Sequence, residues 1–143
     1  MQDDLGAALP EGDVYAWYRR GLDLLEAGDA AAAAQILSHA VAAEPSTPSL
    51  REALARAEFD AGRYVDAAES FAQVVEVEPD NDYALFGLGL AESRLGLFVA
   101  AAEHLALAAV MRPDRAPYAA ALRQVRATLR AREEANGGQG IDA

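Results

Sequence analysis

A spacing of 34 residues recurs through the middle of the chain and limits what the chain can fold into. Proline, glycine and alanine each return at this spacing. The positions are Pro45, Pro79 and Pro113; Gly28, Gly62 and Gly96; and Ala33, Ala67 and Ala101. A fixed period of this length is typical of repeat proteins, in which each unit buries its apolar face against the next unit. We therefore expect a stacked array and not one thick globular core.

Each repeat reads as two amphipathic helices. In the middle repeat, residues 48–81, the first helix breaks at Gly62, because glycine readily takes the left-handed conformation of a helix end. The second helix ends before Pro79, since the residue before a proline is pushed out of the helical region. Asp13 and Asp29 are suited to cap the first two helices. The sequence predicts three helix pairs, over residues 14–47, 48–81 and 82–115.

The two ends of the chain depart from the repeat. Residues 116–135 predict one further helix, with an apolar stripe of Tyr118, Leu122, Val125 and Leu129 and a second stripe of Arg123, Arg126 and Arg130. A helix that is apolar on one side and charged on the other can close the open end of an array. We expect residues 1–13 to form a flexible leader, whose segment Leu5–Leu9 is either free or docked, and residues 136–143 to form a disordered tail.

The net charge of −11 is concentrated in the first half of the chain. Residues 1–82 carry 17 acidic and 5 basic residues, whereas residues 83–143 carry 6 and 7. This surface repels phosphates, which supply most of the affinity in nonspecific nucleic-acid binding, so we expect no nucleic-acid partner. All 12 basic residues are arginine, which we attribute to GC-rich coding in a bacterial genome.

The composition also argues against an enzyme. The chain has no cysteine, which excludes disulfides, thiol nucleophiles and cysteine-bound metals. His39 and His104 are expected on outer helices as surface or hydrogen-bonded residues, and no phosphate loop or zinc motif is present. The sequence has no run of about 18 apolar residues, and its acidic start is unlike a signal peptide. We expect a cytoplasmic, non-enzymatic protein without cofactor, metal or membrane contact.

The repeated residues resemble those of tetratricopeptide repeat (TPR) proteins, whose motif runs W-x2-L-G-x2-Y, then A-x3-F, then P. The matching positions are Trp17, Arg20, Gly21, Leu24, Ala33, Leu37 and Pro45 in the first repeat; Arg51, Leu54, Ala55, Glu58, Ala67, Phe71 and Pro79 in the second; and Leu85, Leu88, Gly89, Glu92, Ala101, Leu105 and Pro113 in the third. The resemblance implies an all-α fold: a right-handed α-solenoid of three antiparallel helix pairs with a seventh, capping helix, in one domain over residues 14–135. It implies little about the partner.

Three departures from the motif place charges at positions that are usually half-buried. Arg20 stands where leucine is usual, and Glu58 and Glu92 stand where tyrosine is usual. A buried lone charge costs several kcal/mol, so these side chains are expected to be paired or turned to solvent. Arg126 lies 34 residues after Glu92, and we predict an ion pair between Glu92 and Arg126 or Arg123 that docks the cap.

In this family the first helix of each pair lines a concave face, where ligand peptides usually lie. By position, that face is Tyr15, Tyr18, Leu22, Leu25 and Glu26; Ser49, Glu52, Arg56, Phe59 and Asp60; and Tyr83, Phe86, Leu90, Ser93 and Arg94. Eight of these fifteen are aromatic or leucine, and exposed apolar patches usually mark interaction sites. The candidate peptide-binding groove consists of all but Glu26, Ser49, Asp60 and Ser93. Its middle repeat forms a charged waist between two apolar patches.

Two functions fit this groove: a scaffold or adaptor that binds a partner peptide or helix, and a structural protein that dimerises through the groove or the terminal helix. A third interpretation is that the array, the leader or the tail covers these residues. Chaperone-binding members of the family hold a C-terminal carboxylate with a clamp of Lys, Asn and Arg. Here Tyr18, Leu22, Glu52 and Ala53 are among the residues at those sites. The partner expected is therefore an apolar helix or a segment with basic flanks.

Overall fold

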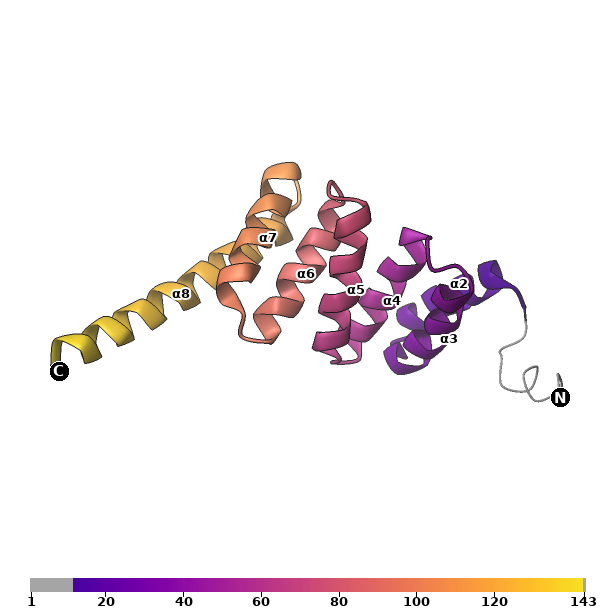
Figure 1. Cartoon of the computed structure of the whole chain (residues 1–143), viewed down its shortest axis with the longest axis horizontal. Coiled ribbons are helices and arrows are strands. Elements are labelled where there is room, and N and C mark those ends of the chain that lie inside the picture. The colour runs from indigo at the N-terminus through magenta and orange to yellow at the C-terminus, as the bar shows by residue number, and fades with distance from the viewer. Residues whose placement is uncertain (1–11, 143) are drawn as a thin grey trace.

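The structure, a computed structural model, describes residues 12–142, with side chains as far as residue 137. In this range it contains seven α-helices and no strand. They are α2 (Val14–Glu26), α3 (Ala30–Ala43), α4 (Pro48–Asp60), α5 (Tyr64–Val77), α6 (Asp82–Arg94), α7 (Phe98–Met111) and α8 (Ala116–Asp142). The helices follow one another in a row, with α2 toward one end and α8 at the other (Figure 1). This arrangement confirms the predicted all-α repeat fold.

The turns and caps between the helices lie at the positions that the sequence predicts. Gly28, Gly62 and Gly96 have φ angles of 84°, 80° and 80°, in the left-handed region that other residues rarely adopt. Asp13 caps α2 by accepting a hydrogen bond from the Ala16 amide at 2.9 Å, and Asp29 caps α3 by accepting one from Ala32 at 3.3 Å. The glycine turns therefore fold each repeat back on itself.

The row of helices bends in one direction. Each helix packs against the next one along the chain, from α2 through to α8. In addition, α2 contacts α4, α4 contacts α6 and α6 contacts α8, whereas α3, α5 and α7 make no contact with one another. The first helices of the pairs therefore lie closer together than the second helices, and they form the inner side of the curve.

Small residues let the two helices of a pair approach. A Cβ atom added at Gly21 would lie 2.5 Å from Leu37 Cγ, and one added at Gly89 would lie 2.6 Å from Leu105 Cγ. Leu37 and Leu105 are completely buried, so neither side chain has room to move away. The structure confirms that these motif positions are small because a helix packs directly against them.

The last helix caps the array and extends beyond it. Tyr118, Leu122 and Val125 are buried, as the predicted stripe requires, and the Arg132 guanidinium lies 4.6 Å from the Phe98 ring centroid. The helix then continues to Asp142 (Figure 1). The prediction of a disordered tail is therefore wrong for residues 136–142. Glycines disfavour a helix by about 1 kcal/mol each, but a formed helix extends without a new nucleus.

The predicted leader falls largely on residues 1–11, which lie outside the described part of the chain. Docking of Leu5–Leu9 therefore stays a prediction. Asp13, which was assigned to the leader, belongs to the first repeat, because its side chain caps α2. Within residues 12–142, no helix combines the length and the apolar character needed to cross a membrane.

Candidate peptide-binding groove

The inner side of the array is hollowed between neighbouring helices. The first hollow, called here the aromatic pocket, lies between α4 and α6 and has a volume of about 140 Å³. It is lined by Arg56, Phe59, Asp60, Phe71, Tyr83, Phe86, Gly87 and Leu90. The second, called here the polar hollow, has a volume of about 500 Å³ and is lined by Tyr18, Leu22, Ser49, Glu52, Ala53, Arg56 and Tyr83. Arg56 and Tyr83 border both hollows, so the two form one groove.

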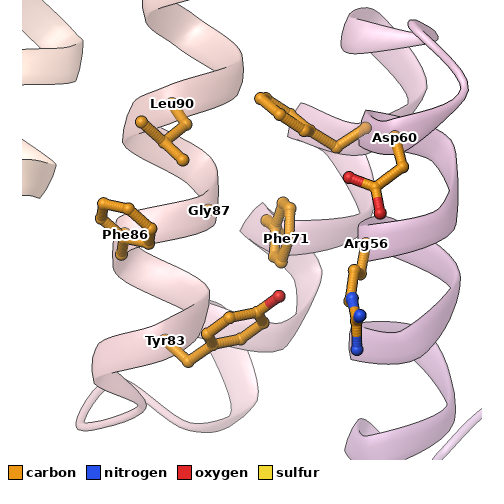
Figure 2. Close-up of a pocket in the computed structure, with 8 residues that line it drawn as sticks. Arg56, Asp60, Phe71, Tyr83, Phe86, Gly87 and Leu90 are labelled. Atoms are coloured by element: carbon orange, nitrogen blue, oxygen red, sulfur yellow. The ribbon is translucent and has the colours of Figure 1, made fainter. Parts of the chain in front are cut away.

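The aromatic pocket depends on a side chain from the outer layer of helices. Phe71 belongs to α5 and is buried, yet its ring lines the pocket between α4 and α6 (Figure 2). It meets Tyr83 edge to face, with 6.2 Å between ring centroids. A Cβ atom added at Gly87 would lie 2.6 Å from Phe71 Cε1. Gly87 therefore provides the space that the Phe71 ring occupies.

Charged groups stand along one wall of the aromatic pocket. Arg56 and Asp60 lie one turn apart on α4, opposite Tyr83 and Phe86 of α6 (Figure 2). Burial raises the pKa of the Tyr83 hydroxyl, while the positive charge of Arg56 acts in the opposite direction. Arg56 lies between the aromatic pocket and the polar hollow. The charged waist was expected between two apolar patches, and its role in ligand binding stays a prediction.

The polar hollow is acidic at its α4–α6 edge. Glu52 accepts a hydrogen bond from Asn81 Nδ2 at 2.7 Å, and the same amide nitrogen lies 3.0 Å from Glu78 Oε1. Burial raises the pKa of Glu52, and the negative charges of Glu78 and Asp82 add to this effect. Asn81 also caps α6, so one side chain fixes both the helix start and the position of Glu52.

Arg94, which the sequence assigned to the groove, contacts Phe59 and Tyr64 and lines neither hollow. Its guanidinium lies 5.7 Å from the Phe59 ring centroid and 5.4 Å from that of Tyr64, and it donates a hydrogen bond to the Tyr64 hydroxyl at 3.1 Å. Contacts of a cation with two aromatic faces hold the side chain in one place. Arg94 thus supports the Phe59 wall and does not itself line the aromatic pocket.

The structure brings together most of the residues that the sequence assigned to the groove. Those that line the two hollows are Tyr18, Leu22, Glu52, Arg56, Phe59, Tyr83, Phe86 and Leu90. Tyr15 lines a third hollow together with Tyr18 and is 69% exposed. Leu25 is only 7% exposed and packs in the core between α2, α3 and α4. Its assignment to the groove surface is wrong, because the last turn of α2 points it toward α3 and α4.

Five residues that line the two hollows were not in the candidate groove: Ser49, Ala53, Asp60, Phe71 and Gly87. Ser49 and Asp60 were placed on the concave face but left out of the groove, Phe71 was identified only as a motif position, and Gly87 was not identified at all. A signal existed for Gly87, because the equivalent positions in the other two repeats hold Arg19 and Ala53. A glycine that breaks the repeat inside a helix often marks a close approach by another group.

The charged residues at buried motif positions find their partners within their own repeat. Glu58 accepts a hydrogen bond from Ser70 Oγ at 2.7 Å, and Glu92 Oε1 lies 2.6 Å from His104 Nδ1. The predicted ion pair of Glu92 with Arg126 or Arg123 is therefore wrong. Glu92 faces α7, and Arg126 and Arg123 are exposed on α8. Arg20 is exposed, as expected for an unpaired charge.

The acidic residues and histidines of the described part of the chain do not form a cluster suited to a metal ion. No group of three or more His, Asp or Glu side chains within residues 12–137 is arranged to hold a metal ion. His104 is bound to Glu92 between α6 and α7, where its role is structural. Over the same range, no buried side-chain nitrogen or oxygen lacks a hydrogen-bond partner.

Solved structures with the same fold include domains whose peptides are known. The first TPR of Spaghetti (RPAP3), bound to the HSP90 peptide SRMEEVD, is 17% identical with a TM-score of 0.78, over 85% of this chain and 96% of that one. The TPR domain of Sgt2 from Aspergillus fumigatus is 21% identical with a TM-score of 0.77, over 92% and 86%. MamA from AMB-1 is 24% identical with a TM-score of 0.73, over 86% and 67%.

These likenesses concern the fold, since all three identities lie below 25%. No curated protein sequence matches the chain. The sequence profile of the tetratricopeptide repeat matches residues 18–76 and 52–120, which together span most of the chain and all three helix pairs. The chain belongs to the tetratricopeptide repeat family.

Proposed function

We propose that this chain is a non-enzymatic binding module that holds a peptide or a helix of a partner protein in the groove formed by α2, α4 and α6. The observation that carries the proposal is the aromatic pocket, where five large apolar side chains surround an open volume of about 140 Å³. Open apolar pockets with a few charged groups at the rim are typical of sites that anchor a ligand. The cytoplasmic location and bacterial origin stay predictions from composition.

Two domains of the same fold bind peptides, which supports a peptide ligand for this groove. The charges of this groove, however, argue against the same peptides. The first TPR of Spaghetti (RPAP3) binds SRMEEVD, and the second TPR domain of human RPAP3 binds SGPTIEEVD. Both peptides end in the acidic sequence EEVD. In the present chain the polar hollow contains Glu52, with Glu78 and Asp82 close by. Like charges repel across an interface, so we expect acidic C-terminal peptides not to bind.

Selection from a library of random nine-residue peptides tests the proposal. The library is panned against the full chain, and the enriched peptides are synthesised and titrated by fluorescence anisotropy. We expect Tyr83→Ala to weaken binding at least tenfold, because it opens both hollows, and Val65→Ala on the exposed side of α5 to have no effect. SRMEEVD serves as the acidic probe. Peptides that bind equally well to Tyr83→Ala would place the binding surface elsewhere.

Self-association is a second candidate, favoured by the outer surface of α7. Val99, Leu107 and Val110 are 64%, 51% and 80% exposed and lie along one side of that helix. Exposed apolar stripes of this kind frequently mark contacts between protein copies. Size-exclusion chromatography with light scattering tests this candidate. A dimer that Leu107→Asp converts to monomer would support it, and a monomer at all concentrations would exclude it.

A further inference from the structure

We infer that the aromatic pocket receives one aromatic or leucine-sized side chain of the partner segment, and that a basic residue of the same segment lies against Glu52 in the polar hollow. This inference rests on the proposed function, because it names the chemistry of the segment that the groove would hold. It defines both the anchor and the charge of the ligand.

The size and lining of the aromatic pocket determine the anchor. A cavity of about 150 Å³ lined by leucine, isoleucine and phenylalanine is large enough to bind benzene. The aromatic pocket has a volume of about 140 Å³ and is lined by Phe59, Phe71, Tyr83, Phe86 and Leu90. The room is therefore that of one six-membered ring or one branched aliphatic side chain.

The walls of the pocket are held in place before a ligand arrives. Phe86 stacks on Tyr118 of α8, with 4.5 Å between ring centroids, and Phe59 is held by Arg94. Phe71 is 2% exposed, and its ring packs against the backbone of α6 at Gly87. A pocket with fixed walls loses little conformational entropy on binding, so an inserted ring keeps most of its burial energy.

The charges around the polar hollow determine the neighbouring residue of the ligand. Glu52 uses Oε1 to accept from Asn81, and no described residue donates to its other carboxylate oxygen, Oε2. The charges of Glu78 and Asp82 act on Glu52, and Arg56 is the one basic residue among those lining this hollow. An arginine or lysine from the ligand would bind Glu52 and reduce the repulsion among the three carboxylates.

The charge argument also favours a partner over the chain's own N-terminal residues. Residues 1–11 contain Asp3, Asp4 and Glu11 and no basic residue. They would bring further negative charge to the acidic side of the groove. A segment of opposite charge from another protein is therefore the occupant that we propose.

The random nine-residue library, panned against the full chain, tests the chemistry of the ligand. The expected result is enrichment of peptides that carry Phe, Tyr, Trp or Leu together with Lys or Arg. Replacing the apolar anchor of such a peptide by alanine should weaken binding about 10- to 100-fold, as expected for the loss of a large buried side chain. Replacing its basic residue by glutamate should weaken binding by a smaller factor that decreases as salt is added.

Variants of the protein show which hollow binds the apolar anchor of the peptide and which binds its basic residue. Leu90→Trp fills the aromatic pocket and should abolish binding, while Leu107→Trp on the outer side of α7 should not. Glu52→Gln keeps an acceptor for Asn81 but removes the charge, so binding should fall about two- to fivefold. Glu69→Gln, an exposed charge change on α5, is the matched control. Unfolding midpoints of all variants show whether each remains folded.

The outcomes separate this inference from the proposed function. Peptides that bind in the groove but lack an apolar anchor, or that carry acidic residues in place of basic ones, would overturn the inference and leave the binding module in place. Peptides unaffected by Tyr83→Ala would overturn both. A chain lacking residues 1–11 that binds the peptide ten times more tightly would show that these residues occupy the groove, against the inference.

Discussion

Residue types repeat every 34 positions between the two helices of each pair, but they vary from repeat to repeat on the inner face of the array. Between the helices, the same kinds of residue return every 34 positions: Leu37, Phe71 and Leu105 are all buried against a small residue of the facing helix or its neighbour. On the inner face the repeats differ, with Leu22, Arg56 and Leu90 at equivalent positions. Residues that repeat stabilise the stack, whereas residues that differ distinguish one hollow from the next.

Phe71 is the residue where the two regions meet. It occupies the repeated core position and also lines the aromatic pocket. Phe71→Ala should lower the free energy of unfolding by about 3–5 kcal/mol, because it removes a buried aromatic ring and leaves a cavity. Urea unfolding followed by circular dichroism measures the loss.

Leu105→Ala is the control for Phe71→Ala, since it changes the same position of the next repeat and Leu105 does not line the pocket. It should destabilise by about 2–5 kcal/mol and leave peptide affinity unchanged below the unfolding transition. A stability loss below about 1 kcal/mol for Phe71→Ala would show that the ring belongs to the groove surface and not to the core.

The cap supports the groove through one hydroxyl. Tyr118 stacks on Phe86 and donates a hydrogen bond to Asp82 Oδ2 at 2.7 Å. Tyr118→Phe should cost about 1–2 kcal/mol, as expected for a bond to a charged acceptor, whereas Tyr15→Phe at an exposed position should change stability by less than about 0.5 kcal/mol. Equal effects of the two changes would mean that the Tyr118 hydroxyl does not hold the cap.

The same hydroxyl gives a pH dependence with a definite sign. Burial, together with the hydrogen bond and the charge of Asp82, raises the pKa of Tyr118 to about 12. Because the folded value lies above the unfolded one, this stabilisation is complete below pH 10 and is lost as the pH rises toward 12. The stability difference between the wild type and Tyr118→Phe should therefore shrink over that interval. A difference that stays constant would contradict the assignment.

Two buried glutamates interrupt the repetition of apolar residues in the interior. Leu24 and Ile36 of the first pair are replaced by Glu58 and Ser70 in the second and by Glu92 and His104 in the third. Burial raises the pKa of Glu58 above its ordinary value of 4.5, so the stability linked to its proton is present below pH 4.5 and is lost as the pH rises through the folded value.

Glu58→Gln keeps an acceptor for Ser70 Oγ and removes the buried charge. We expect a higher thermal midpoint than the wild type at pH 7, with a gain smaller than the Tyr118 loss, and little difference at pH 4. Glu69→Gln provides the exposed comparison on the same repeat pair. A lower midpoint for Glu58→Gln at pH 7 would show that the ionised carboxylate stabilises the fold.

Arg56→Ala should have the smallest effect on stability and a clear effect on binding. Arg56 is exposed and borders both hollows, so its removal should change the free energy of unfolding by less than about 0.5 kcal/mol. A library-selected peptide should bind more weakly, because the border between the hollows sets its register. Arg126→Ala on α8 is the matched control. Parallel losses of stability and affinity would make Arg56 a structural residue.

The difference between the two regions explains what the sequence could predict. Glycine turns, small facing residues and the apolar stripe of α8 follow from local rules that the period repeats, so helices and core were predictable. The Glu92–His104 contact and the reach of Phe71 past Gly87 depend on how neighbouring helices fit together. The assignment of Leu25 to the groove was wrong for the same reason. It was taken from the family's concave-face positions, and these do not show that Leu25, in the last turn of α2, packs in the core with α3 and α4.

Chemical-shift mapping by two-dimensional NMR of the ¹⁵N-labelled chain with a selected peptide tests the separation of core and groove most directly. We predict the largest changes at the amides of Arg56, Phe59, Tyr83, Phe86 and Leu90, on the inner helices that line the groove. The outer surfaces of α5 and α7, around Val65, Leu107 and Val110, should change little. Changes centred on those outer residues would contradict the assignment of binding to the inner face.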